Sequence, residues 1–402
     1  MTAPALVSLD DVRAARERIW PHLRETPVEE GHALSRLAGR RLLLKPEQRQ
    51  RTGSFKFRGA LEFVSHLEPG VDVVAASAGN HAQGVALAST LHGHRATIFM
   101  PSDAALPKVA ATRDYGAEVV AVEGGVDDCI AAAADAASEV GAVFVPPFAH
   151  PWVIAGQGTV GLEIADEAPG IETVVVPVGG GGLVAGIGAA LARVRPDVHV
   201  VGVEAAGAAK LRASLAAGRP VTLDRVETFA DGIALRSASE ITLAHVDAFV
   251  DEVVTVTDEE MAIAIVALAE RAKAVVEPAG AAAVAAVIAG KVTGDPVLAV
   301  VSGGNVDPLL LGRVLTHGMA AAGRFLAIEV VLPDRPGSLA GLAREVAQLR
   351  ANVLYVSHRR VGVDVGVDSV AVELHLETRD DDHADAVVAA LARSGFEVRG
   401  RR

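Results

Sequence analysis

The sequence predicts a parallel α/β fold for most of the chain and a smaller α+β domain at its C-terminal end. From about residue 40 to residue 320, short runs rich in Val and Ala alternate with amphipathic helical windows, a pattern typical of βαβ units around a parallel sheet. Hydrophobic residues make up 50% of the chain but aromatic residues only 3%, so small aliphatic side chains must build the core. Such a core suits packed helices and strands better than a β-sandwich.

Seven short runs are expected to form the strands of the parallel part. Each run is rich in Val and Ala and is followed by a window with helical periodicity. The runs cover residues 71–75, 96–100, 118–122, 142–145, 173–176, 199–203 and 296–301. Residues 183–194 are expected to be a helix that directly follows four glycines, and residues 308–324 a last helix with a connector.

The pattern changes after residue 324. Strands are expected at residues 325–331, 353–360, 370–377 and 396–399, with helices at residues 337–349 and 383–393. This order of elements, βαββαβ, is that of a ferredoxin-like domain. We therefore expect two domains, residues 1–322 and residues 325–402.

Composition excludes several classes of protein. The 402-residue chain has 37 basic and 50 acidic residues, a formal charge of −13, whereas nucleic acids and anionic membranes attract clustered Lys and Arg. We therefore expect neither a nucleic-acid nor a membrane partner. The single cysteine, Cys129, excludes an internal disulfide and fits a reducing compartment, so a cytoplasmic location is expected. Charges near the N-terminus, such as Asp10 and Arg13, do not fit a signal peptide.

The first motif that can carry chemistry is the segment TGSFKFRGA, which places Lys56 between Phe55 and Phe57. Aromatic neighbours exclude water from an amine, lower its pKa and make it a better nucleophile toward a carbonyl. Taken alone, a lysine of this kind is more often a surface residue with a solvated ammonium group.

The second motif, SAGNHAQG, starts at Ser77 and follows the first expected strand, where a helix should begin. Small residues with Ser and Asn at a helix N-terminus expose backbone N–H groups that suit a carboxylate. An ordinary N-cap explains the same residues equally well.

The third motif, Gly179-Gly180-Gly181-Gly182-Leu183, lies between an expected strand and an expected helix. Four glycines let the backbone close around a phosphate whose charge the helix dipole favours. The segment also satisfies the dinucleotide fingerprint, and Glu204 follows about 20 residues later, as NAD binding requires. A dehydrogenase is therefore an alternative.

The fourth motif, SGGN, runs from Ser302 to Asn305 after the strand at residues 296–301. A glycine turn at a strand end is common in any α/β sheet. However, the second, third and fourth motifs each follow a strand directly, and open α/β sheets bind ligands at these strand ends. The three motifs together therefore indicate one ligand site.

The order of the four motifs closely resembles that of the fold-type II pyridoxal-phosphate enzymes, and specifically the threonine/serine dehydratases. The resemblance covers nearly the whole chain, and Phe148 and residues 154–159 (IAGQGT) match the stretch between the two catalytic subdomains of that family. It implies a tryptophan synthase β-like fold with two parallel-sheet subdomains. The smaller subdomain, roughly residues 55–150, would be inserted in the larger one.

The resemblance also implies roles for individual residues. Lys56 would hold pyridoxal phosphate as a Schiff base and later take the Cα proton of the substrate. The other cofactor contacts would come from Phe55, from Asn80 at the 3′-oxygen, from Ser302 at the pyridine nitrogen, and from Gly179, Gly180, Gly181, Gly182 and Leu183 at the phosphate. The substrate carboxylate would bind to the loop formed by Ser77, Ala78, Gly79, Asn80 and His81. A neutral hydroxyl at the ring nitrogen makes the ring a weaker electron sink, which favours early loss of the β-hydroxyl.

Some related enzymes bind a divalent cation through an acidic site after the strand that here ends near Glu204. This chain lacks the second acidic residue and has Lys210 in the following segment. We therefore expect no metal site. Lys210 would either replace the charge of the cation by pairing with Glu204 or, more plainly, be a solvated lysine on a helix.

The C-terminal part resembles an ACT domain, a small module that binds amino acids in regulated biosynthetic enzymes. The segment DRPGSL matches the first strand-to-helix turn of that module, and an asparagine precedes the second strand. The resemblance implies an isoleucine or valine effector. It would bind at Asp334, Gly337, Ser338, Leu339 and Asn352. The alternative is a purely structural domain that promotes dimers.

These observations predict a cytoplasmic threonine dehydratase that converts L-threonine to 2-oxobutanoate and ammonia, and L-serine to pyruvate. By resemblance it would be a homodimer or homotetramer, and its product would feed isoleucine biosynthesis. Serine racemase and hydroxyaspartate ammonia-lyase are alternatives within the family, although Ala78 stands where the racemases have a serine. An amino-acid sensor with an inactive catalytic domain is the alternative outside enzymes.

Overall fold

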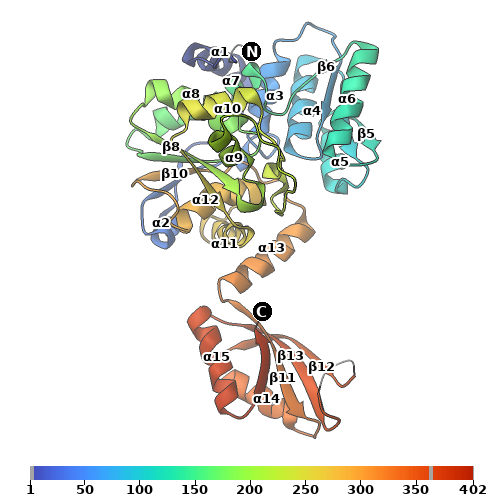
Figure 1. The fold of residues 1–402 in the computed structure, drawn as a ribbon, viewed down its shortest axis with the longest axis vertical. Coiled ribbons are helices and arrows are strands. Elements are labelled where there is room, and N and C mark those ends of the chain that lie inside the picture. The colour runs from blue at the N-terminus through green and yellow to red at the C-terminus, as the bar shows by residue number, and fades with distance from the viewer. Residues whose placement is uncertain (1–3, 362–364, 402) are drawn as a thin grey trace. The chain divides into compact units, whose positions relative to one another are not determined.

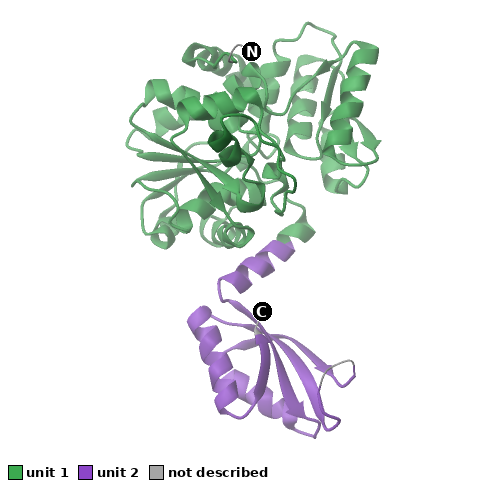
Figure 2. Ribbon diagram, viewed as in Figure 1, with its two compact units in different colours: residues 1–311 green, residues 312–402 purple. Residues whose placement is uncertain are grey.

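The computed structural model describes residues 4–361 and 365–401. The chain forms two compact units, Met1–Leu311 and Gly312–Arg402 (Figure 2). The division falls inside helix α13 (Pro308–Ala321).

A six-stranded sheet organises the larger part of the first unit (Figure 1). Its strand order is β1-β2-β10-β7-β8-β9, and all neighbours are parallel except β1 and β2. The strands are β1 (Glu29–Glu30), β2 (Leu42–Lys45), β10 (Val297–Val300), β7 (Thr173–Pro177), β8 (His199–Ala205) and β9 (Glu252–Val256). The central strands are buried on both faces, which explains their continuous apolar sequences.

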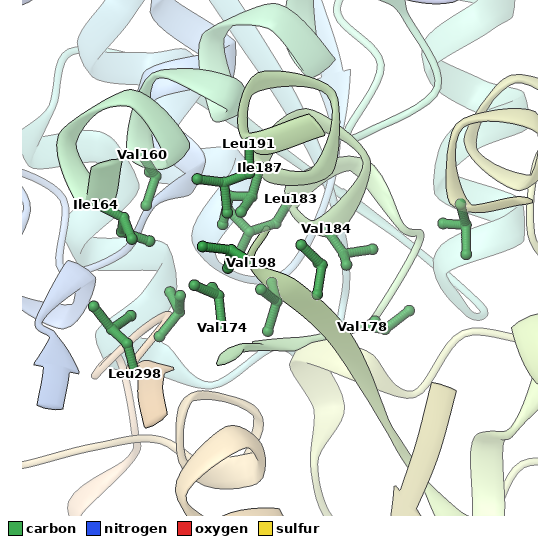
Figure 3. Close-up of a cluster of buried hydrophobic side chains, with 14 of the residues drawn as sticks. Val160, Ile164, Val174, Val178, Leu183, Val184, Ile187, Leu191, Val198 and Leu298 are labelled. Atoms are coloured by element: carbon green, nitrogen blue, oxygen red, sulfur yellow. The ribbon is translucent and has the colours of Figure 1, made fainter. Parts of the chain in front are cut away.

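Helices cover both faces of this sheet. On one face lie α7 (Pro151–Glu167), α8 (Gly182–Val194) and α10 (Glu240–Phe249), and on the other lie α11 (Asp258–Ala267) and α12 (Pro278–Ile288) (Figure 1). Figure 3 shows side chains of α7 and α8 over Val174 and Leu298. A Cβ on Gly186 would lie 2.3 Å from the carbonyl oxygen of Ile154, so only glycine lets α8 approach α7 so closely.

A second, four-stranded sheet in the same unit is entirely parallel, with the order β5-β4-β3-β6. Its strands are β5 (Glu118–Val122), β4 (Ala96–Pro101), β3 (Val73–Ala76) and β6 (Val143–Phe144). Helices α3 (Lys56–Val64), α4 (Asn80–His92) and α5 (Leu106–Asp114) lie on one face and α6 (Val126–Val140) on the other. Together the two sheets confirm the predicted α/β class.

The large sheet has three strands that the sequence did not predict. These are β1, β2 and β9, whereas all seven predicted strands are present near their expected bounds. The run of β2 is only four residues long and ends in Lys45, whose buried amine pairs with Glu163 at 2.8 Å. Because a charged residue ends so short an apolar run, the sequence alone shows no recognisable strand there.

The second unit has the predicted βαββαβ order. Its antiparallel sheet has the order β12-β13-β11-β14, and both helices pack against the buried face of the sheet. The elements are β11 (Phe325–Pro333), α14 (Ser338–Gln348), β12 (Asn352–Arg359), β13 (Ser369–Glu377), α15 (Asp381–Arg393) and β14 (Glu397–Arg401). This arrangement is ferredoxin-like.

The remaining helices of the first unit are α1 (Leu9–Ile19), α2 (His32–Ala38) and α9 (Lys210–Ala217). In the part of the chain that the structure describes, no helix has both the length and the apolar character needed to span a bilayer.

A buried ionic network anchors α3 to the large sheet. The Arg58 guanidinium group donates two hydrogen bonds of 2.8 Å to Glu47 in the 3-10 helix Glu47–Arg49, and it also binds Glu163 on α7. All three side chains are almost completely inaccessible to solvent. Because an unpaired charge is costly in such a place, the network fixes the first turn of α3, where Lys56 lies.

Candidate active site

Three of the four motifs are in direct contact at the ends of their strands. The side-chain amide of Asn305 donates to the Thr52 carbonyl at 2.6 Å and to Asn80 Oδ1 at 2.8 Å. The segment before Lys56 also pairs with the fourth motif, since the Phe55 N–H donates to the carbonyl of Ser302 at 3.1 Å. Asn305, a residue whose role was not predicted, therefore joins the first, second and fourth motifs.

The glycine loop joins this group through Pro147 and Phe148. Lys56 Nζ donates to the Pro147 carbonyl at 2.8 Å. The ring of Phe148 lies directly over the loop, because a Cβ on Gly180 would be 2.2 Å from Phe148 Cδ1. A side chain at position 180 is therefore excluded, and all four motifs meet around Lys56.

Lys56 is half-buried at the first position of α3. Burial lowers the pKa of its amine to about 8, and the nearby Glu277 carboxylate opposes this shift. The Phe55 ring lies 5.3 Å from Nζ. Phe57, by contrast, is fully buried in the core of the smaller sheet, so the predicted desolvation by both phenylalanines is correct only for Phe55.

Glu277 is the titratable residue of this site that the sequence analysis missed. It directly precedes α12, yet its carboxylate does not cap that helix; instead, Oε1 accepts a 2.6 Å hydrogen bond from Asn80 Nδ2. Burial, together with the charge of Asp231, raises the pKa of Glu277 to about 7. The sequence does contain a signal that could have identified Glu277: it is the one carboxylate in the otherwise apolar stretch AVVEPAGAAA.

The glycine loop has the properties of an anion site. Within the described residues, the backbone N–H groups of residues 179–184 donate no hydrogen bond to protein atoms, although residues 180–184 are buried. Gly181 has a φ of 89°, which favours glycine, and α8 begins at the next residue. Buried donors at a helix N-terminus fit a phosphate group.

Two hydroxyls near Lys56 also have no protein partner. The Oγ1 atom of Thr52 and the Oγ atom of Ser54 are buried without a hydrogen bond in the described part of the chain. Buried polar groups are normally paired, so two orphaned hydroxyls fit a pocket that holds a polar ligand. Ser302, which is also buried, lies close to them because residue 54 bridges residue 303.

The second motif forms a turn with free donors. Ser77 Oγ accepts from the Gly79 N–H at 3.1 Å, and a Cβ on Gly79 would meet nothing within 4 Å. The N–H groups of residues 78 and 80–82 have no protein acceptor among the described residues. His81, however, binds the Val145 carbonyl at 2.9 Å through its ring, and burial with the charge of Lys56 lowers its pKa to about 3. Because its ring is neutral and bonded to Val145, His81 itself can offer a substrate carboxylate only its backbone N–H.

Glu204 and Lys210 form a fully buried ion pair at 3.1 Å. The interpretation of Lys210 as a solvated lysine is therefore wrong. Glu204 also accepts the N–H groups of Leu211 and Arg212, at 2.9 and 3.0 Å, so its carboxylate cannot serve a ribose as the dinucleotide alternative requires. Among the described residues, no group of three His, Cys, Asp or Glu side chains is placed to hold a metal ion.

The predicted effector residues lie in the second unit. Asp334 accepts two hydrogen bonds from Arg360, at 2.8 and 2.9 Å, which lower the pKa of its carboxyl group. Gly337 has a φ of 94° and precedes α14, whose first residues are Ser338 and Leu339. Asn352 begins β12 and donates to Glu377 at 3.3 Å.

Comparisons with known proteins agree with this geometry. Residues 19–303, which include both sheets of the first unit, match the family described as pyridoxal-phosphate dependent enzyme. The chain is 44% identical to an L-threonine ammonia-lyase of Thermotoga maritima over 98% of its own length and 99% of that protein. It is 43% identical to an L-threonine ammonia-lyase of Geobacter sulfurreducens, over 96% and 98% of the two chains.

Solved structures show the same fold. The processed form of threonine deaminase isoform 2 from Solanum lycopersicum superposes with a TM-score of 0.74 at 34% identity, covering 79% of this chain and 91% of that one. Maize serine racemase superposes with a TM-score of 0.74 at 33% identity, covering 77% and 97%. With a glycine loop that fits a phosphate and relatives that share nearly its full length, the chain belongs to the fold-type II pyridoxal-phosphate-dependent enzymes.

Proposed function

We propose that the chain is an L-threonine ammonia-lyase, which converts L-threonine to 2-oxobutanoate and ammonia and also L-serine to pyruvate. The observation that carries the proposal is the half-buried Lys56 amine, with its pKa lowered to about 8, beside a loop of free, buried N–H groups. Two L-threonine ammonia-lyases that are similar over nearly their whole length support the choice of substrate.

The residues present fit pyridoxal phosphate, the cofactor of this family. Lys56 would bind it covalently, and the N–H groups of Gly179 to Leu183 would hold its phosphate. Phe55 would pack beside it, Asn80 would face its ring oxygen and Ser302 its ring nitrogen. Once bound, pyridoxal phosphate supplies an electron-withdrawing ring that acidifies the Cα–H bond of an amino acid.

Lys56 would move the proton of the reaction. An amine whose pKa lies near neutrality accepts and returns protons efficiently, so Lys56 Nζ is suited to take the substrate Cα proton. The Pro147 carbonyl orients this amine at 2.8 Å. The N–H groups of residue 78 and residues 80–82 would bind the substrate carboxylate, which holds the Cα–H bond toward Lys56.

Glu277 would hold a second proton in the site. Asn80 occupies Oε1 and a pKa of about 7 leaves the carboxyl group partly protonated at neutral pH. Two titratable groups whose pKa values have moved toward neutrality within one pocket are typical of acid–base chemistry.

We also propose that residues 325–402 form an ACT domain attached to a catalytic domain of residues 1–322, with a smaller subdomain of roughly residues 55–150. The ferredoxin-like order of the second unit supports this assignment. Isoleucine or valine would bind near Asp334, Gly337, Ser338, Leu339 and Asn352. We further propose a cytoplasmic homodimer or homotetramer that serves isoleucine biosynthesis.

The role of Lys56 can be tested by labelling and by substitution. Borohydride reduction of the loaded protein followed by peptide mapping should label Lys56. Lys56→Ala should lower kcat by about 10²–10⁴-fold or more, since a positioned acid–base group contributes this much. Lys291→Ala, which removes a lysine paired with Glu260 away from the site, should keep normal activity. A label on any other lysine would contradict the assignment.

Glu277 makes the stability of the cofactor-free chain depend on pH. Its pKa is raised from 4.5 to about 7, so the folded chain holds a proton in this range that the unfolded chain releases. The free energy of unfolding should therefore fall as pH rises through this window, by at most about 1.4 kcal/mol per pH unit. Urea denaturation from about pH 5 to about pH 8 should show that the free energy of unfolding of Glu277→Gln, relative to that of the wild type, increases as the pH rises. If the difference in free energy of unfolding between Glu277→Gln and the wild type does not change with pH, the raised pKa of Glu277 is refuted.

Ala78 predicts elimination rather than racemisation. Racemisation requires a second acid–base group opposite the lysine, and an alanine methyl can neither donate nor accept a proton. L-serine should therefore give pyruvate and ammonia with little D-serine in chiral chromatography, whereas Ala78→Ser should introduce a trace of D-serine and slow elimination. D-serine formed by the wild type as fast as pyruvate would place the chain with the racemases.

The effector assignment predicts that an amino acid changes the initial rate. Isoleucine and valine should alter the threonine deamination rate and raise the melting temperature of the full chain, because a ligand of the native state stabilises it. A 1–322 truncation should lose both responses. If no amino acid changes the rate or the melting temperature of the full chain, the second unit has only a structural role.

A further inference from the structure

An ion pair connects a helix of the smaller sheet to a segment that lies against the active site. Lys108 Nζ, in the first turn of α5, donates to Asp231 Oδ2 at 2.6 Å. Asp231 begins the 3-10 helix Asp231–Ile233, which lies between α9 and α10 in the chain. The side chain of Lys108 is 19% exposed and that of Asp231 is 57% exposed. Because water screens so open a pair, its contribution to the stability of the fold is small.

The 3-10 helix Asp231–Ile233 packs directly against two parts of the site. A Cβ on Gly232 would lie 3.9 Å from Glu277 Oε1. A Cβ on Gly179, the first residue of the glycine loop, would lie 3.0 Å from the carbonyl oxygen of Gly232. Asp231 is therefore the chain neighbour of a residue that lies against both Glu277 and the glycine loop, and it brings a negative charge to the edge of the site.

The chain before Asp231 is held independently of Lys108. Thr228 Oγ1 donates to Asp258 Oδ1 at 2.6 Å, and the Phe229 N–H donates to Asp258 Oδ2 at 3.0 Å. Asp258 is the first residue of α11, which packs on the large sheet. The Asp231 backbone therefore has its own anchor, and its charge stays near Glu277 when Lys108 is absent.

Side chains from four elements act on the Glu277 carboxyl group. Burial and the negative charge of Asp231 raise its pKa to about 7, whereas the hydrogen bond from Asn80 on α4 and the positive charges of Lys108 on α5 and Lys56 on α3 oppose this shift. Charges interact strongly with a buried group, because little water lies between them. The two members of the ion pair therefore have opposite effects on the same proton.

We propose that Lys108 and Asp231 are positioning residues for the proton on Glu277, and that their ion pair couples the contact between α5 and the 3-10 helix to the charge of this carboxyl group. The proposal rests on the proposed acid–base role of Glu277. While the pair is closed, Lys108 offsets the charge of Asp231 and favours the carboxylate form of Glu277. Separation of α5 from the 3-10 helix would leave Asp231 unpaired, which favours the protonated form.

The two charges can be removed one at a time, and the proposal requires opposite effects. In the full-length, cofactor-free chain, each protein is compared with its own Glu277→Gln derivative by urea denaturation across pH. The difference in free energy of unfolding should rise above about pH 4.5 and reach a plateau at the pKa of Glu277 in the folded wild type, about 7. Asp231→Asn should move the start of this plateau to lower pH and Lys108→Met should move it to higher pH, each by roughly 0.5–1 pH unit.

Lys291→Met is the matched control. Lys291 also forms an ion pair of 2.6 Å, with Glu260, but it follows the end of α12 whereas Glu277 precedes its start. This variant should keep the plateau at the wild-type pH. In the loaded enzyme, the part of the pH profile of kcat that Glu277→Gln removes should move in the same two directions in Asp231→Asn and Lys108→Met.

Two results would overturn the proposal. A plateau at the wild-type pH in both charge variants would show that the pair only joins two elements. Shifts of both variants in one direction would show that the substitutions act by admitting water. If one variant does not fold, the other still decides the proposal through the sign of its shift. A loaded wild type that forms no oxo acid from threonine refutes the proposed function instead, whereas the cofactor-free measurements still test the ion pair.

Discussion

The site depends first on the buried Arg58 guanidinium group. Arg58 lies two residues after Lys56, and its bonds to Glu47 and Glu163 connect the first turn of α3 to the 3-10 helix after β2 and to helix α7, which packs on the large sheet. Replacing one partner would leave an uncompensated charge in the core, which proteins tolerate poorly. The reactive lysine therefore stands on a rigid support, and small displacements of a reacting group cost much of its rate.

Different groups of the site are suited to binding anions and to exchanging protons. The N-termini of α4 and α8 present free backbone donors, which suit the carboxylate and the phosphate of the reactants without any mobile positive side chain. Lys56 and Glu277 instead have pKa values shifted toward neutrality, the property expected of groups that exchange protons. Asn80 belongs to both tasks, because it starts α4 and also binds Glu277 at 2.6 Å.

The sequence predicted those parts of the site that have a local signature. Glycine runs and small residues directly after a strand indicate a helix N-terminus with free donors. Three of the motifs are in direct contact, and the glycine loop joins them through Pro147 and Phe148. Glu277 was missed, and the bridging role of Asn305 within the fourth motif was not predicted, because both depend on partners about 200 residues away in the chain. Of the two interpretations of Lys210, the solvated one is wrong because helical periodicity does not show that its amine meets Glu204 at the end of β8. Strand β2 was not predicted for a similar reason. Its short apolar run ends in Lys45, whose charge is neutralised by Glu163 on α7, a residue far away in the sequence.

The most direct test of the account is an absorbance spectrum of the purified full chain, followed by addition of L-threonine with quantification of oxo acid and ammonia. The account predicts a visible band that belongs to bound pyridoxal phosphate and equal amounts of 2-oxobutanoate and ammonia after threonine is added. A colourless protein that forms no oxo acid and binds NAD instead would contradict it.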